Sequence, residues 1–129
     1  RPMTMTSSVP YLLRAINEWI LDNDLTPYLI LDATVADTQV PLNYVKDDQI
    51  VLNISPSAIR DLMIEDGHLA FSGRFGGVSH YIHAPMRAVL GIVAKENGEG
   101  MWFPREDKDP EPTPPKAIKK GPPALKVIK

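Results

Sequence analysis

Apolar side chains between Tyr11 and Asn23 recur with the spacing of one helical face. At 100° per residue they fall within roughly 160° of arc, and charged and amide side chains occupy the opposite side. Pro10 stands near the first helical position, where its missing N–H costs nothing, and Thr26-Pro27 ends the pattern. We therefore predict a helix over residues 10–23. The apolar stripe consists of Leu12, Leu13, Ala15, Ile16, Trp19 and Ile20.

After Pro27 the pattern changes to short β-branched and aromatic segments separated by turn residues. Glu65-Asp66-Gly67, Gly76-Gly77 and Asn97-Gly98 are typical turns. Pro41 favours an edge position for its segment, because proline cannot donate to a ladder. The prediction is one N-terminal helix followed by an antiparallel β meander, folded as a small open barrel or two packed sheets. We expect strands over residues 28–34, 40–44, 49–54, 59–64, 68–75, 78–84 and 101–103, with 86–94 open between strand and helix.

The apolar stripe of the predicted helix has two interpretations. Either it only covers a sheet of its own domain, or it serves both the core and a second copy of the chain. We favour the second, a twofold homodimer, because one terminal helix beside a small sheet leaves Trp19 and Tyr11 hard to bury together. The residues expected at the dimer interface are Tyr11, Leu12, Ala15, Ile16 and Trp19.

Proline and charge dominate the chain after Phe103. We expect a disordered lead-in over residues 1–8, one folded domain over 9–103 and a flexible proline-rich linker over 104–123. Residues 124–129 form a short apolar and basic peptide at the end of that linker. A folded body with a tethered peptide holds one partner while offering a handle to another, which indicates binding and delivery rather than catalysis.

The charge is unevenly distributed. Residues 1–103 hold 7 Lys and Arg against 12 Asp and Glu, a balance of −5, whereas residues 104–129 hold 7 against 4, a balance of +3. An acidic body argues against a protein that tracks nucleic-acid phosphates. The chain has no cysteine, which excludes disulfides and thiolate chemistry. With no run of 18 apolar residues and no apolar signal-peptide core in residues 1–8, we expect a cytoplasmic protein.

Candidate catalytic and metal-binding residues are few. His80 and His83 are three apart in a predicted strand, so they point to opposite faces, and His68 follows a turn. The acidic pairs Asp47-Asp48 and Glu65-Asp66 lie in turns, where solvated carboxylates are routine. No nucleophile elbow, phosphate-binding loop or zinc helix is present in the sequence. We expect no enzymatic activity, no metal and no cofactor.

Short segments along residues 10–104 occur in an order that is specific when they are taken together. PYLLRA at 10–15 is followed by Glu18-Trp19, Asp22-Asn23 and Leu25-Thr26-Pro27. QIVLNI at 49–54, RFGG at 74–77 and ENG at 96–98 come next, and the chain ends in GPPALKVIK. This set resembles the stringent starvation protein B (SspB) family of bacterial protease adaptors.

The resemblance implies a function that composition does not supply. Family members are similar to Sm-like β folds, with an N-terminal helix that forms the dimer. Their folded domain binds the ssrA (tmRNA) tag that ribosome rescue adds to stalled proteins. Their flexible tail docks on the N-terminal zinc-binding domain of the unfoldase ClpX and so delivers tagged proteins to the ClpXP protease.

By similarity, an extended tag is expected to lie in a groove formed by strands, where it gains main-chain hydrogen bonds. The core remains an equal alternative for Phe71 and Phe75, since alternate aromatic residues in a strand usually face inward. The tag-binding residues implied are Asn53, Ile54, Ser55, Pro56, Ser57, Ala58, Ile59, Phe71, Ser72, Gly73, Arg74 and Phe75. The ClpX-docking residues implied are Ala124, Leu125, Lys126, Val127, Ile128 and Lys129.

A second class of function is an Sm-like RNA-binding module, because small β barrels often bind RNA and the tail is basic. It predicts salt-sensitive RNA affinity and aromatic residues on a basic face. The balance of −5 on residues 1–103 disfavours this class. A small hydrolase, the third class, requires a clustered acid and base that the sequence does not present.

Overall fold

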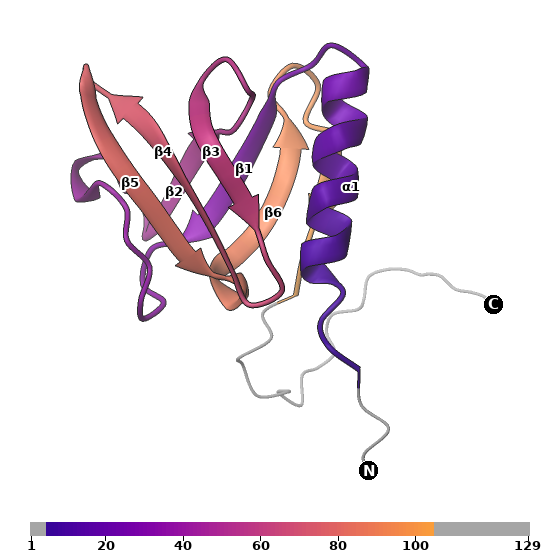
Figure 1. The fold of residues 1–129 in the computed structure, drawn as a ribbon, viewed down its shortest axis with the longest axis horizontal. Helices are drawn as coiled ribbons and strands as arrows, with labels where there is room; N and C mark the ends of the chain where they lie inside the picture. Colours follow the sequence, from indigo (N-terminus) through magenta and orange to yellow (C-terminus); the bar gives the residue numbers. More distant parts are fainter. Residues whose placement is uncertain (1–4, 105–129) are drawn as a thin grey trace, which may run out of the picture.

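The computed structural model of the protein describes residues 5–104, which form one helix and two facing antiparallel sheets (Figure 1). The first sheet has the strand order β2-β1-β6-β7 and the second the order β3-β4-β5. This confirms the predicted fold class, mostly β with a single N-terminal helix. The elements are α1 Val9–Asp22, β1 Pro27–Asp32, β2 Gln49–Asn53, β3 Ile59–Ile64, β4 His68–Phe75, β5 Val78–Pro85, β6 Val89–Ala94 and β7 Gly100–Trp102.

The order of the strands differs from the predicted meander. β3, β4 and β5 follow one another as hairpins, but β1 lies between β2 and β6, so Tyr28 pairs with Asn53 on one side and with Val93 on the other. Leu29 is fully buried and Ile30 is only 4% exposed. A strand buried on both faces takes a central position in its sheet. The hydrophobic pattern of β1 does not show which strands lie beside it. The prediction of a simple meander was therefore wrong.

Two segments differ from the predicted strands. The edge strand expected over residues 40–44 was wrong, because Leu42–Tyr44 form a 3₁₀ turn and Gln39 makes only an isolated bridge to His83. Pro41, with φ at −72°, lies directly before that turn and has no N–H to donate to a neighbouring strand. The ambiguous segment 86–94 divides into a 3₁₀ turn, Met86–Ala88, followed by strand β6.

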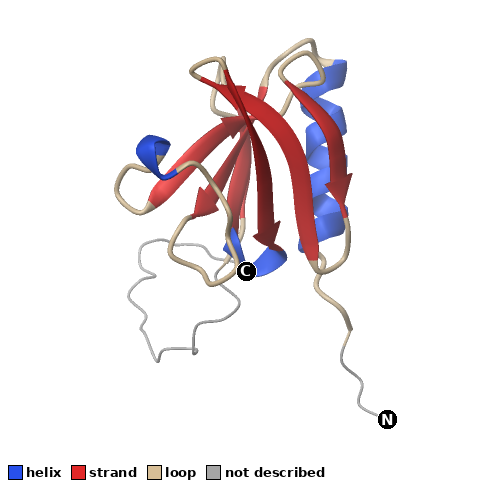
Figure 2. Ribbon diagram, turned by 60° about the vertical axis from the view of Figure 1, so that its left-hand side comes forward, coloured by secondary structure: helices blue, strands red, loops and turns tan. Residues whose placement is uncertain are grey.

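Helix α1 lies along one side of the strands and closes the core there (Figures 1 and 2). It begins with Pro10 in its first turn, as predicted, and its inward side chains Leu13 and Ile20 are buried with the inner residues of both sheets. Arg14 anchors the helix to the second sheet, because its guanidinium donates to the Ile64 carbonyl oxygen at 2.9 and 3.1 Å. In residues 5–104, no helix has the length and apolar character to cross a membrane.

A side-chain clamp joins the end of the helix to the β6–β7 hairpin. The Glu96 carboxylate accepts hydrogen bonds from the Thr26 backbone N–H at 2.9 Å and from the Thr26 hydroxyl at 2.7 Å. These two bonds, the backbone one first, hold the pKa of Glu96 below its ordinary value of 4.5. The Lys95 N–H also donates to the Thr26 carbonyl oxygen at 2.8 Å. The clamp thus fixes the chain between α1 and β1 against the hairpin that carries β7.

Candidate functional site

A groove of about 390 Å³ opens at the end of the second sheet where β4 ends and where β3 and β5 begin. Its lining comes from the turn before β3, the first residues of β3, the last residues of β4 and one residue of β5. The residues that line the groove are Pro56, Ser57, Ala58, Ile59, Arg60, Ser72, Gly73, Arg74 and Ser79.

The lining of the groove is polar and positively charged. Arg60 pairs with Ser72 across the β3–β4 ladder, and Arg74 pairs with Ser79 across the β4–β5 ladder. Because Ser72 and Arg74 are two apart in one strand, these four side chains lie on the same face of the sheet. Both arginines are exposed, and no carboxylate is among the residues that line the groove. The groove therefore offers guanidinium and hydroxyl donors to a ligand that carries carboxylates.

The backbone beside the groove is suited to an extended ligand. β3 is an edge strand of its sheet, so one side of its backbone has no strand partner within residues 5–104. The turn before it is closed by the Ala58 N–H, which donates to the Ser55 carbonyl oxygen at 2.9 Å. Asp61 has φ of +57° at an irregularity in the β3–β4 register, which lies between the pairs Arg60–Ser72 and Met63–Ala70. An exposed edge of this kind can accept another strand by main-chain hydrogen bonds.

Gly73 is the one glycine among the residues that line the groove. A Cβ atom on Gly73 would lie 3.4 Å from Ile59 Cγ2, 3.7 Å from Phe75 Cε1 and 4.0 Å from Phe71 Cε2, which are ordinary contacts. The rings of Phe71 and Phe75 therefore lie on the face of the sheet to which a side chain at position 73 would point, opposite to Ser72 and Arg74.

The structure brings seven of the twelve predicted tag-binding residues together in the groove and places the other five around it. The seven are Pro56, Ser57, Ala58, Ile59, Ser72, Gly73 and Arg74. Ile54 and Phe71 are each 1% exposed and belong to the core, which for Phe71 is the alternative that the sequence left open. The Asn53 side chain accepts hydrogen bonds from the Ser55 N–H and hydroxyl, and these bonds fix the start of the turn. Phe75 is half-buried against the Tyr44 ring, with ring centres 5.1 Å apart.

Sequence reasoning missed two residues of the groove, Arg60 and Ser79. The strand register places both of them in the groove, because each is paired with a predicted residue on the neighbouring strand. The Gly76-Gly77 turn, with both glycines at positive φ, fixes the β4–β5 register, so Ser79 could have been found by counting back from Arg74. Arg60 had no comparable signal, because the register between β3 and β4 shifts.

The outer side of helix α1 forms a second exposed surface. Tyr11 is 55% exposed and Trp19 is 47% exposed, Ala15 is exposed, and Leu12 and Ile16 are half-buried. The stripe is therefore divided: Leu13 and Ile20 are in the core, and Leu12 and Ile16 pack against the core while partly exposed. Of the residues predicted for the dimer interface, Tyr11, Ala15 and Trp19 are exposed.

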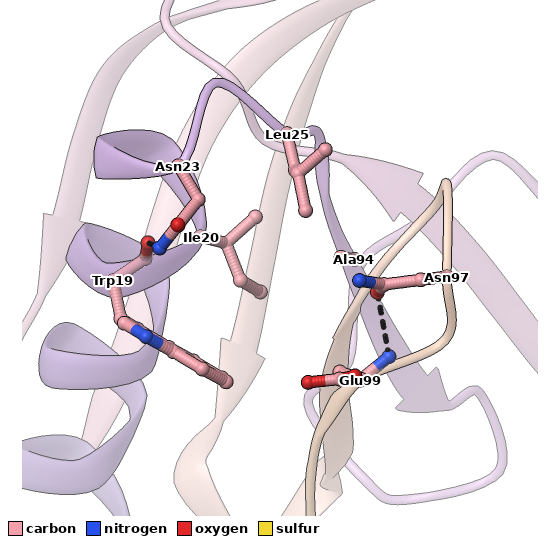
Figure 3. A pocket seen from close by; sticks show the side chains of 7 residues that line it. All are labelled: Trp19, Ile20, Asn23, Leu25, Ala94, Asn97 and Glu99. Atoms are coloured by element: carbon pink, nitrogen blue, oxygen red, sulfur yellow. Dashed lines mark hydrogen bonds between the residues drawn. The ribbon is translucent and has the colours of Figure 1, made fainter.

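A small hollow of about 120 Å³ lies beside Trp19, between the end of the helix and the β6–β7 hairpin (Figure 3). The Trp19 side chain points across this hollow toward Glu99 (Figure 3). The hairpin side is held by the Asn97 side-chain oxygen, which accepts from the Glu99 N–H at 3.0 Å. The lining residues are Trp19, Ile20, Asn23, Leu25, Ala94, Asn97 and Glu99.

The remaining candidates are not among the residues that line the groove. His80 contacts the Phe75 ring edge-on, whereas His83 stacks on His68 on the other face of the sheet, as the strand periodicity predicted. Asp47 and Asp48 both have positive φ in the turn before β2. In the described part of the chain, no group of three or more His, Cys, Asp or Glu side chains could hold a metal ion. The linker after Pro104 and the docking peptide 124–129 lie outside the described residues.

Comparison with known proteins gives two findings. The family model for stringent starvation protein B matches residues 7–127. A protein of Haemophilus influenzae named stringent starvation protein B homolog is 50% identical over 98 residues. That alignment covers 76% of the present chain and 65% of the relative, so the matched part is just under two thirds of the relative's length.

Proposed function

The chain belongs to the stringent starvation protein B family, and from this premise we propose that it is a non-enzymatic, cytoplasmic protease adaptor. In this proposal the folded domain binds ssrA (tmRNA)-tagged proteins, and the C-terminal peptide delivers them to the ClpXP protease. The observation that carries the proposal is the groove between β3, β4 and β5. It combines an open strand edge with two arginines, which is the chemistry that an extended peptide with carboxylates requires.

Two sources of binding free energy operate in the groove. Main-chain hydrogen bonds from the β3 edge are independent of peptide sequence, so they supply affinity for any extended segment. Arg60 and Arg74 add charge-assisted hydrogen bonds to acidic side chains or to a C-terminal carboxylate, and these select among segments. The hydroxyls of Ser72 and Ser79 add donors and acceptors on the same face. A groove built in this way needs no cofactor, because it breaks no bond.

The accessible face of helix α1 supports a homodimer. Its exposed aromatic side chains, Tyr11 and Trp19, lie on a face whose opposite side is already buried in the core. The hollow between Trp19 and Glu99 offers a recess for a side chain of the second copy. A dimer carries two C-terminal peptides, and two tethered peptides bind a multimeric motor more tightly than one through effective concentration.

The delivery step rests on residues 124–129, whose sequence combines apolar Leu125, Val127 and Ile128 with two lysines. Apolar side chains supply the contact surface and the lysines steer the peptide toward an acidic partner surface. The partner in this proposal is the N-terminal zinc-binding domain of ClpX.

The test of tag binding uses a rescue-tag peptide carrying a fluorescent label, titrated with the full chain and followed by anisotropy. Ala58→Trp places an indole on the exposed rim of the groove and should weaken binding by about tenfold or more, or 1.4 kcal/mol. Ala36→Trp is the matched control, because Ala36 is also an exposed alanine in a turn but lies outside the groove. Equal affinity of both variants, or no binding by the unmodified protein, would contradict the proposal.

The test of delivery removes residues 124–129. The truncated protein should bind the tag peptide with unchanged affinity but should no longer enhance ClpXP degradation of a tagged reporter at low substrate concentration. Undiminished degradation after this deletion would count against the delivery step while leaving tag binding intact.

A further inference from the structure

Two of the three histidines of the chain lie together on the outer face of the β3-β4-β5 sheet. His83 pairs with Ala70 across the β4–β5 ladder, and His68 is two residues before Ala70 on the same face, so the two histidines are diagonal neighbours. Their ring centres are 5.1 Å apart and their planes differ by 28°. Neither residue lines the groove assigned above to the tag peptide.

The His83 ring is held in a defined tautomer. Its Nδ1 atom lies 3.1 Å from the Asp37 carbonyl oxygen, which can only accept a hydrogen bond. In the neutral imidazole Nδ1 therefore carries the hydrogen, and the lone pair of Nε2 stays available. A backbone carbonyl that accepts from the second ring nitrogen is the usual support of a histidine that ligates a metal, because it fixes the ring orientation and raises ligand basicity.

The loop that supplies this carbonyl is itself fixed to the strand. The Gln39 N–H donates to the His83 carbonyl oxygen at 2.7 Å, and the His83 N–H donates to the Gln39 carbonyl oxygen at 3.1 Å. Backbone and side chain of His83 are thus both held by residues 37–39. His68 is different. Its ring stacks on His83, and its side chain makes no hydrogen bond within residues 5–104. Its χ2 torsion is intrinsically broad, so no strong rotamer preference opposes a turn of the ring.

We propose that His68 and His83 together bind one divalent transition-metal ion of the imidazole-preferring class, Zn²⁺, Ni²⁺ or Cu²⁺. His83 supplies Nε2, and His68 supplies one ring nitrogen after a rotation about χ2. Metal–nitrogen distances of about 2.0–2.1 Å place the centres of two imidazoles on one ion roughly 5 Å apart, which matches the observed separation. The remaining coordination positions are filled by water, for which the open hollow of about 490 Å³ around the pair has room.

The ligand set predicts which ions bind. Two neutral nitrogen ligands favour borderline metals over hard oxygen-seeking ions, so Mg²⁺ and Ca²⁺ should not bind there. Among divalent first-row ions Cu²⁺ should bind most tightly, following the general order of affinity. With two protein ligands rather than three or four, the ion exchanges with solution and is not a condition of folding. This inference goes beyond the proposed adaptor function, and neither depends on the other.

The experiment is isothermal titration of the 129-residue chain with ZnCl₂, NiCl₂ and CuCl₂ in a buffer that does not chelate metals. The chain has no cysteine and only one other histidine, so His80→Gln is a matched control on the same strand. We expect one ion per chain for the unmodified protein and for His80→Gln. His68→Gln and His83→Gln should each weaken binding by at least about tenfold, because each removes a ligand rather than its support.

Three results would overturn the proposal. These are no stoichiometric binding, an equal loss of affinity in His80→Gln, and unchanged affinity in both ligand variants. His83→Gln also removes the contact with the 37–39 loop, so His68→Gln, which leaves that contact in place, tests the metal site separately. Far-ultraviolet circular dichroism reports whether each variant is folded. Tag-peptide affinity measured on the same variants should be unchanged, so failure of the metal site leaves the adaptor proposal standing.

Discussion

Arg60 and Arg74 are the two charged residues among those that line the groove, and they provide the sharpest test of its role. Replacing each by glutamine removes the positive charge while keeping a polar side chain of similar length. Both side chains are exposed, so the relevant scale is that of solvent-exposed ion pairs, about 0.2–1 kcal/mol each. A single replacement should therefore weaken binding of an acidic peptide by about 1.4- to 5-fold, and the double replacement by about 2- to 30-fold.

The assay is fluorescence anisotropy with a labelled tag peptide and with a second peptide in which Asn and Gln replace its Asp and Glu. The arginine variants should lose affinity for the first peptide and much less for the second. Salt provides a second measurement, because the Debye length falls from about 10 Å at 0.1 M to about 3 Å at 1 M. The difference between the original protein and the double variant should therefore shrink as salt is added.

Arg87→Gln is the control for net charge, since Arg87 is exposed in the 3₁₀ turn before β6 and lies outside the groove. Its affinity for both peptides should equal that of the original protein. An equal loss for the acidic and the neutral peptide would refute the reasoning, because it would show that the arginines act through structure rather than charge. A loss of the same size in Arg87→Gln would do so as well, by pointing to the net charge of the whole domain.

Three further predictions concern the scaffold. Gly100→Ala should lower the free energy of unfolding in urea by about 3 kcal/mol. A Cβ atom at position 100 would overlap the Ile92 carbonyl oxygen, and backbone atoms cannot move aside as a flexible side chain can. An unchanged midpoint of the urea unfolding transition would contradict this. Glu96→Gln should lower the melting temperature at pH 7, because the charged carboxylate of Glu96 is stabilised by its bonds to Thr26. The difference from the original protein should vanish as the pH falls below the ordinary carboxyl pKa of 4.5 and through the lower pKa of Glu96 in the folded protein. A difference that persists at low pH would refute the assignment to charge. Trp19→Asp should leave the half-exposed helix folded but yield a monomer by light scattering, whereas a dimer of undiminished stability would place the interface elsewhere.

Local regularities of the sequence were sufficient for most of the elements, with residues 40–44 and 86–94 as the exceptions. The helical spacing of Leu13 and Ile20 and the position of Pro10 located α1 to within about a residue, because helix termini and amphipathic faces are set by near neighbours. The Gly76-Gly77 turn located the β4–β5 hairpin for the same reason, since its two positive φ values are a requirement of the turn alone. The family was also recognisable from ordered segments, because these survive in sequence without reference to contacts.

Contacts between distant segments were decided only by the tertiary structure. The place of β1 between β2 and β6 and the entry of Arg60 into the groove depend on pairings that no local turn fixes, since β1 pairs with a strand about 60 residues away and the β3–β4 register shifts. Register is selected by the burial of whole faces at once, so no window of neighbouring residues contains the information. The sequence alone therefore determined which residue types were available, and the packing of two sheets and a helix determined which of them meet.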